Sequence, residues 1–409
     1  MERKNIIRMA ACAAAALLSA ACIYPYEVEL GTNSEYPLVI EGDINIGGYT
    51  TVKVSHVHPF NWDSESNPDV FNLSGHVEGE DGIWENGYYD QESGVFYIDT
   101  RRLSPNQRYR LVLETGKDGV TNQFESDWLA PSPAPTIDGL SYSKNDQFSE
   151  LWIGLSMHCN GEHYFRWSFK ETWEYHADMQ AYVGFFPGYY DSWRRTYIGG
   201  EYKQLNPTYY YCWNSETSSQ INIFSTAHQT EDRFEDLAFH TISLRDKRLQ
   251  VMYKITVSLS AISEDAYNYW NNIKQSSSEQ GSIFAPVPSM MASNIHCVTD
   301  PAMEVVGYLS ASTQTEATMY YDNAEEKFFK GTTPYPTQID TLDSTDITAA
   351  ISAYLHEYRP YLGIYQSVKM DENGTTIPSE YLWVRRECVD CRREGGTKDK
   401  PEGWPTNHE

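Results

Sequence analysis

The sequence predicts a mainly β protein, with an N-terminal immunoglobulin-like β-sandwich followed by a larger β-rich domain that has one or two helices. The first observation is the composition. The 409 residues include 31 Tyr and 11 Trp, and aromatic residues favour strands. The second is a series of short apolar–polar alternations that are separated by turn residues. The third is that only two segments repeat their apolar residues with helical spacing.

The first 21 residues have the organisation of an export signal. A short basic start precedes an apolar run from Met9 to Ala21, which is shorter than the ~20 residues of a membrane-spanning helix. Small residues lead into Cys22, so residues 1–21 are predicted to be a signal peptide. Cleavage there would make Cys22 the first residue of the mature chain and the site of lipidation.

Three alternatives to lipidation at Cys22 fit the same pattern. Cys12 also lies in the apolar run, although few apolar residues precede it. An ordinary secreted protein could be cleaved nearby, or the segment could be a plain hydrophobic N-terminus. Two or three acyl chains on Cys22 would form a lasting anchor, since each buried CH₂ contributes ~0.8 kcal/mol. Residues 22–35 would then form a tether between the membrane and the folded body.

Residues 36–130 are predicted to form the immunoglobulin-like sandwich. Turns are expected at Gly47-Gly48, at 80–82, at Asn86-Gly87 and at 118–119. Tyr109 follows a loop and begins an alternating strand, which resembles the tyrosine corner of such sandwiches. The predicted strands are Leu38–Ile46, Thr51–Val57, Val70–Val77, Val95–Ile98 and Arg108–Glu114.

A proline-rich stretch, LAPSPAPT at residues 129–136, predicts a stiff connector and a domain boundary. The second domain is expected to span residues 137–405. It is predicted to contain strands at Glu150–Met157, His163–Phe169, Gln220–Ser225, Thr241–Leu244, Leu249–Leu259 and Met303–Ala311.

Two helices are predicted inside this second domain. Ser263 can cap the first, and Ala266, Tyr269, Trp270 and Ile273 would share its buried face. The second is expected at Ser344–Glu357, where Ile347, Ile351, Tyr354 and Leu355 form one stripe.

Aromatic residues are concentrated between Tyr164 and Trp213. Within this stretch, Gly and Pro residues predict a loop or hairpin tip. Rigid rings with polar edges suit stacking on sugars or anchoring a protein partner. Alternatively, the rings fill a tyrosine-rich core. The candidate ligand or partner contacts are Phe185, Phe186, Tyr189, Tyr190 and Trp193.

The cysteines after Cys22 are disulfide candidates, because an exported protein meets an oxidising environment. Cys212, Cys297, Cys388 and Cys391 allow three pairings, between which the sequence does not choose, and Cys159 is expected to be left over. A loop closed by a disulfide commonly contributes ~2–4 kcal/mol. Cys388 and Cys391 have the spacing of half a zinc site, but a compact site needs four ligands, so no metal is predicted.

The formal net charge of −26 argues against nucleic acid as a partner, because nucleic-acid binding needs a basic surface. His56 and His58 alternate on one strand, but two ligands are too few for a metal site. The sequence contains no G-x-S-x-G elbow and no phosphate-binding glycine loop. We therefore expect a protein that is not an enzyme and has no cofactor.

Several short segments of the mature chain, taken together, form a pattern that is specific to one protein family. With them, the chain resembles a Bacteroidota lipoprotein family known as domain of unknown function 4249, over nearly the whole mature part. The segments are Val39–Gly42, Cys212-Trp213, Ile221–Ile223, Arg248-Leu249, Leu259–Trp270, Gly281–Pro288, Asn294–Cys297, Val306–Tyr308, Cys388–Arg392 and Gly395-Gly396.

This resemblance implies a lipid-anchored protein of the outer membrane, on its outer or periplasmic face, and a TonB-dependent transporter as its partner. It implies no catalytic residues. The expected function is an accessory or ligand-binding subunit of nutrient uptake, with the ligand unknown. The alternatives are a structural or adhesion lipoprotein without a transport role, and a surface hydrolase.

Overall fold

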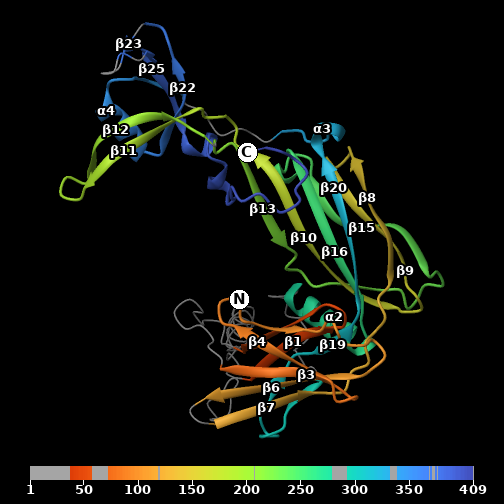
Figure 1. Cartoon of the computed structure of the whole chain (residues 1–409). Coiled ribbons are helices and arrows are strands. Elements are labelled where there is room, and N and C mark those ends of the chain that lie inside the picture. The colour runs from red at the N-terminus through yellow and green to blue at the C-terminus, as the bar shows by residue number, and fades with distance from the viewer. Residues whose placement is uncertain are drawn as a thin grey trace, which may run out of the picture.

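The computed structural model describes residues 37–57, 72–117, 120–206, 208–278, 293–331, 339–367, 369–370, 374 and 376–408. The predicted signal peptide, Cys22 and the tether lie outside these residues. The described chain forms three β-rich modules, seen from the bottom to the upper left of Figure 1. We call them the proximal sandwich, the central sandwich and the distal module.

The proximal sandwich is a pair of sheets that share one strand, β4, in a continuous path of hydrogen-bonded strands. The strand order is β17-β7-β6-β3-β4-β5-β2-β1-β18, with β19 also paired to β1. The strands are β1 (Leu38–Asn45), β2 (Tyr49–His56), β3 (Leu73–Gly79), β4 (Trp84–Asp90), β5 (Val95–Asp99), β6 (Tyr109–Lys117), β7 (Val120–Ser126), β17 (Ile295–Cys297), β18 (Val305–Val306) and β19 (Leu309–Ser312).

Alternation along these strands places apolar side chains in one shared core. Ile40 and Phe96 from one sheet meet Val77 and Leu113 from the other, and all four are buried. The predicted tyrosine corner is confirmed: the buried Tyr109 hydroxyl donates to the carbonyl oxygen of Ser104 at 2.8 Å. It also accepts from the Ser104 N–H at 2.9 Å.

Strand β4 corrects one predicted turn. Asn86-Gly87 lies inside this strand, where Gly87 pairs with Ile98. A Cβ on Gly87 would lie 2.3 Å from the Phe96 ring, so only glycine fits where the strand crosses the core. The Asn-Gly pair therefore reflects close packing rather than a hairpin.

Strands β17, β18 and β19 correct the predicted domain boundary. They come from residues 295–312, which were predicted to belong to the second domain, yet they pair with β7 and β1. Ile295, Cys297 and Leu309 lie in the core of the proximal sandwich. The chain thus returns to complete the first module, a long-range pairing that local sequence patterns do not encode.

The central sandwich packs a five-stranded sheet against a three-stranded sheet. The first has the order β13-β10-β16-β20 with β14 on β10, and the second has the order β15-β9-β8. Its elements are β8 (Thr136–Asn145), β9 (Glu150–His158), β10 (Tyr164–His176), β13 (Tyr211–Thr217), β14 (Asn222–Ser225), β15 (Arg233–Ser243), η1 (Lys247–Leu249), β16 (Met252–Ala261), β20 (Gln314–Asp322) and α3 (Asn323–Glu326).

Helix α2 (Glu264–Ser278) begins where the sequence predicts, because the Ser263 hydroxyl accepts from the Ala266 N–H at 3.2 Å. The predicted face packs Ala266, Tyr269 and Trp270 into one cluster with Ile223. The Tyr269 hydroxyl donates to Glu41 on β1 at 2.7 Å, so α2 joins the proximal sandwich to the central one.

The distal module consists of an extended hairpin, a small sheet and a helix, with the C-terminal segment after it. Its elements are β11 (Val183–Asp191), β12 (Thr196–Gln204), β21 (Asp340–Asp343), α4 (Ile347–Leu355), β22 (Tyr358–Ile364), β23 (Lys369–Met370), β24 (Thr376–Ile377), β25 (Glu380–Arg385), η2 (Arg386–Cys388) and η3 (Cys391–Glu394). Helix α4 is shorter than predicted because Asp346 caps it, accepting from the Ala349 N–H.

Candidate functional site

The candidate site is the β11–β12 hairpin, which projects from the distal module at the upper left of Figure 1. Its tip is organised by Asp191, whose Oδ1 accepts from the backbone N–H groups of Trp193 and Arg194 at 2.9 and 3.1 Å. Arg195 closes the turn in the left-handed conformation, with φ of 52°. The sequence thus fixes a tight turn that presents Trp193 outward.

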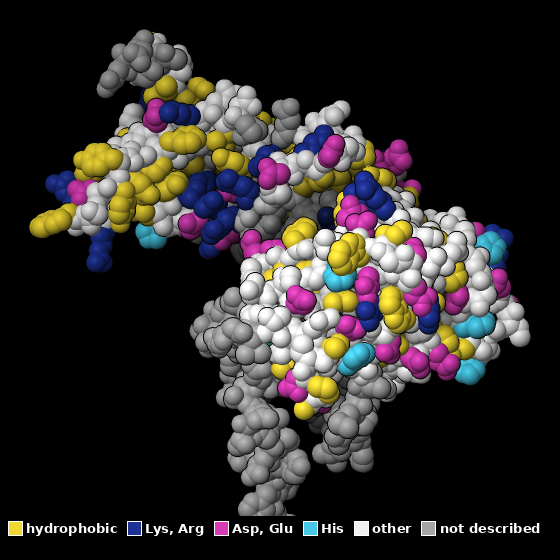
Figure 2. Space-filling view, turned by 60° about the horizontal axis from the view of Figure 1, so that its bottom comes forward, with side chains coloured by type: hydrophobic (Ala, Val, Ile, Leu, Met, Phe, Trp, Pro, Cys, Tyr) yellow, Lys and Arg dark blue, Asp and Glu magenta, His cyan; other side chains and the backbone are white. Residues whose placement is uncertain are grey.

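Four of the five predicted contact residues lie on the exposed surface of this hairpin. Trp193 is 96% exposed, Tyr189 67%, Tyr190 53% and Phe186 43%. Figure 2 shows hydrophobic side chains at the outer end of this part of the molecule, at the left. Exposed rings gathered on one projecting element are a feature of recognition surfaces rather than of a core.

Phe185 does not belong to this surface, which corrects the prediction. It is 4% exposed and packs against Tyr202 and Trp383, with ring centroids 5.2 and 5.8 Å away. Successive side chains of a strand point to opposite faces, so Phe186 faces outward because Phe185 faces the core. The core interpretation therefore holds for Phe185 alone among the five.

The inner face of the hairpin is held by a dense aromatic platform. Tyr202 stacks on Tyr381 of β25 with centroids 3.8 Å apart, and Tyr197 meets Tyr354 of α4 at 5.9 Å. Burial raises the pKa of Tyr202, in keeping with its place inside this packing. This packing orders the backbone of the hairpin, so its outward rings are presented by a stable element.

An arginine cluster lies next to the hairpin, and sequence reasoning missed it. Arg386 and Arg392 pair with Asp390 at 3.0 and 2.8 Å. Arg359, Arg386 and Arg393 share Glu357 at 3.8, 3.5 and 3.5 Å. Four guanidinium groups thus face two carboxylates, which leaves an excess of positive charge in a chain of net charge −26. Figure 2 shows a group of Lys and Arg side chains inward of the hydrophobic tip.

The arginines stack on rings as well as pairing with acids. The Arg392 guanidinium carbon lies 3.6 Å from the Tyr209 ring centroid, and that of Arg359 lies 3.9 Å from Tyr354. Burial acts to raise the pKa of Asp390, but hydrogen bonds and charge from Arg392 and Arg386 outweigh it and lower that pKa. A crevice of about 190 Å³ separates these arginines from the hairpin residue Phe186.

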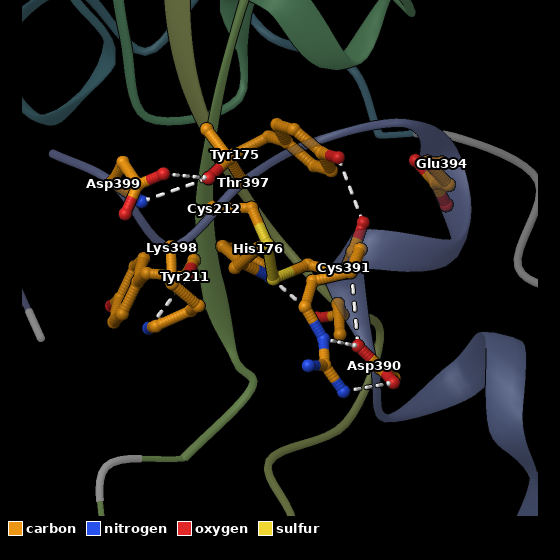
Figure 3. Close-up of a disulfide and its surroundings, with 12 residues drawn as sticks. Tyr175, His176, Tyr211, Cys212, Asp390, Cys391, Glu394, Thr397, Lys398 and Asp399 are labelled. Carbon is orange, nitrogen blue, oxygen red and sulfur yellow. Dashed lines mark hydrogen bonds and ion pairs between the residues drawn. A yellow bond between two sulfur atoms is a disulfide. The ribbon is translucent and has the colours of Figure 1, made fainter. Parts of the chain in front are cut away.

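A disulfide bond attaches the C-terminal segment to the central sandwich (Figure 3). It joins Cys212 of β13 to Cys391 of η3, with Cα atoms 5.8 Å apart. The Tyr175 hydroxyl donates to the Cys391 carbonyl oxygen at 2.8 Å, and the Trp213 and Thr397 backbones pair on the other side. The bond therefore fixes the segment that carries the arginine cluster.

Of the four disulfide candidates, Cys297 and Cys388 take no part in this bond. Cys297 lies in β17, inside the core of the proximal sandwich, where its sulfur is 3.4 Å from the Thr299 hydroxyl. Cys388 is buried three residues before Cys391 and takes no part in the Cys212 bond. Cys159, expected to be left over, is a buried free thiol in the central core. Cys297 cannot reach the others because its strand belongs to another module.

Two buried carboxylates on β10 are held by their own neighbours. Glu171 accepts from Arg248, His240 and Tyr253 at 3.0, 3.1 and 2.8 Å. Glu174 accepts from the Trp404 indole at 2.9 Å, and the same tail also places His408 against it. These partners satisfy buried charge, so we assign both carboxylates a structural role.

Neither a metal site nor a membrane-spanning helix is found among the described residues. These residues contain no group of three or more His, Cys, Asp or Glu side chains that could hold a metal ion. No helix of the described segments is long and apolar enough to cross a membrane.

Comparison with known proteins gives one informative match. A family model described as "Domain of unknown function (DUF4249)" matches residues 23–318. That match ends within β20, so the resemblance expected for Cys388–Gly396 lies beyond it. No curated protein matches the chain. A two-domain fibronectin type III segment from chicken tenascin aligns at 11% identity over 54% of this chain and 88% of that chain, with a TM-score of 0.16.

Proposed function

The chain belongs to the family of the domain of unknown function (DUF4249), and from this membership we propose an outer-membrane lipoprotein that serves a TonB-dependent nutrient uptake system as an accessory or ligand-binding subunit. In this proposal, acyl chains on Cys22 hold the protein at the outer membrane of a Bacteroidota cell. The proximal sandwich follows the tether, and the distal module carries the surface that meets the transporter.

One observation carries the proposal: the rings of Tyr189 and Trp193 are presented to solvent by a hairpin whose other face is firmly packed. Aromatic residues dominate the binding energy of protein interfaces because they bury a large area at a low cost in side-chain entropy. Exposed apolar rings also carry an unfavourable hydration cost, which contact with a partner would remove.

The arginine cluster places an excess of positive charge next to the exposed rings of the hairpin. Arg359, Arg386, Arg392 and Arg393 outnumber Glu357 and Asp390, whereas the chain as a whole is strongly acidic. A partner with acidic loops would be attracted to this end and repelled elsewhere, which favours one docking orientation.

Photo-crosslinking in cells tests the contact directly. A photoreactive amino acid in place of Trp193 is expected to trap a TonB-dependent transporter. The matched control places it at Tyr88 in the proximal sandwich, which is as exposed as Tyr189 at 67%. A transporter trapped equally from both positions, or from neither, would contradict the proposed contact.

A structural or adhesion role remains the second candidate, because exposed rings serve any partner surface. It predicts crosslinks from position 193 to proteins other than transporters, or to extracellular polymer.

A further inference from the structure

A cavity of about 460 Å³ lies between the proximal and central sandwiches. The proximal side contributes Asp43, Lys53 and Tyr97, and the central side contributes Arg166, Trp167 and Trp270. Its volume falls within the ~300–1,000 Å³ typical of small-molecule sites, and such sites often form where modules meet. The cavity is separate from the hairpin and from the arginine cluster.

Arg166 is the central feature of this cavity. Its guanidinium carbon lies 4.1 Å from the Trp270 ring centroid. Burial lowers the pKa of Arg166, and the charges of Asp43 and Glu41 only partly offset this effect. Within the described chain, its guanidinium has no ion pair within 4.0 Å and no hydrogen bond. The Arg166 side chain is partly exposed, so its donors can be reached from the cavity, and a planar carboxylate is the group that matches them.

Further polar atoms around the cavity lack partners among the described residues. Asp43 uses Oδ2 to accept from the Ser312 hydroxyl at 2.6 Å, whereas its buried Oδ1 accepts from no group. The indole N–H groups of Trp167 and Trp270 are also buried without an acceptor. These three atoms have almost no accessible surface, so they lie behind the walls of the cavity rather than within reach of a ligand inside it.

We propose that this cavity binds a small saccharide that contains a uronic acid. Its carboxylate pairs with Arg166, and its rings contact the aromatic walls formed by Tyr97, Trp167 and Trp270. Three aromatic side chains together with several Ser and Thr hydroxyls suit a hydroxylated ring better than a purely apolar ligand.

The biological role of this site rests on the proposed uptake function. The proposal adds the chemical class of the ligand to that function. The binding itself is a property of the purified mature protein and needs no transporter. A failure of binding and a failure of transporter crosslinking are therefore separate results.

Tryptophan fluorescence and calorimetry test the proposal with digalacturonate as the probe. The control ligand is the neutral galactose disaccharide with the same linkage. Both are titrated at 0.15 M NaCl, where a Debye length of about 8 Å screens repulsion by the acidic surface. We expect saturable binding of digalacturonate, with the neutral disaccharide at least about tenfold weaker because it lacks the charge-assisted hydrogen bonds.

Arg166→Gln is expected to weaken digalacturonate binding by about tenfold or more, since it removes the paired charge. Arg101→Gln is the matched control, because Arg101 also stacks on a ring, that of Tyr49 at 4.8 Å, but lies outside the cavity.

If Arg166→Gln does not fold, Lys53→Met provides the second test, since Lys53 is an exposed residue of the cavity rim and its loss should still weaken binding. Absence of saturable binding, equal binding of the neutral disaccharide, or full affinity in folded Arg166→Gln would overturn the proposal.

Discussion

Cys212 and Cys391 form a disulfide bond across a sequence separation of 179 residues. The bond connects β13 of the central sandwich to the C-terminal segment that follows β25. It thereby links the part of the chain covered by the family match to a part that lies beyond it. The arginine cluster is carried by that second part, so its position depends on this covalent link.

Loss of this bond should destabilise the protein. We expect Cys212→Ser with Cys391→Ser to lower the free energy of unfolding by ~2–5 kcal/mol, because a long loop is released in the unfolded chain. Thermal unfolding with and without a reductant measures the effect. Reductant should lower the melting temperature of the parent protein and leave that of the double variant unchanged. Equal sensitivity of both proteins would contradict the assignment.

The two faces of the hairpin should respond differently to alanine. Phe185→Ala is expected to cost ~3–5 kcal/mol in unfolding free energy, because it leaves a cavity beside Trp383. Tyr189→Ala and Trp193→Ala should change it by about 0.5 kcal/mol or less, as is usual for exposed positions. Chemical denaturation checks this. A large loss in the Trp193 variant would show that the tip is part of the core.

Asp390 should make stability depend on acid pH. Its pKa is lowered in the folded protein, so its stabilising charge is fully present above the ordinary Asp value near 4 and is lost as pH falls through the lower folded value. Asp390→Asn should therefore cost ~2–4 kcal/mol near pH 7, by exposing unpaired arginines.

The difference between the parent protein and Asp390→Asn should shrink as the pH drops below about 4. Unfolding measured from pH 3 to 7 follows this change. Asp99→Asn is the control, because Asp99 also pairs with an arginine, Arg101, but at a solvent-exposed site where an ion pair contributes little. A difference for Asp390→Asn that stays constant across this range would contradict the assignment.

Gly307 tests whether the returning strands complete the proximal sandwich. It has φ of 118°, and a Cβ there would lie 2.0 Å from the Ile40 carbonyl oxygen on β1. Gly307→Ala should cost ~2–3 kcal/mol or more, because β1 must shift. The control Gly331→Ala has φ of 82° and no atom within 4 Å, so only ~1–2 kcal/mol of backbone strain is expected. Denaturant unfolding separates the two. Equal costs would mean that the contact with β1 is unimportant.

Local patterns predicted the elements whose determinants lie close together in sequence. The mainly β class, the tyrosine corner at Tyr109 and the start of α2 at Ser263 all follow from neighbouring residues. The Asn86-Gly87 turn was wrong because Gly87 is required by contact with Phe96, which the sequence pattern does not display.

Features built from distant segments could not be predicted in this way. The return of residues 295–312 to the proximal sandwich depends on pairing with β1 and β7. The arginine cluster meets the hairpin only because β22 and β25 pack against β11 and β12. Side chains alternate between the two faces of a strand, so this alternation could have assigned Phe185 and Phe186 to opposite faces of the hairpin. It is the one sequence pattern that could have refined the candidate site.

Affinity purification from solubilised outer membranes tests the central claim most directly. The full-length protein is compared with the Tyr189→Ala, Trp193→Ala double variant and with the equally exposed control Tyr88→Ala. We predict that a TonB-dependent transporter co-purifies with the parent and the control, and is depleted with the folded double variant. Recovery of the same transporter with all three proteins would refute the hairpin as its contact, and recovery with none would refute the uptake function.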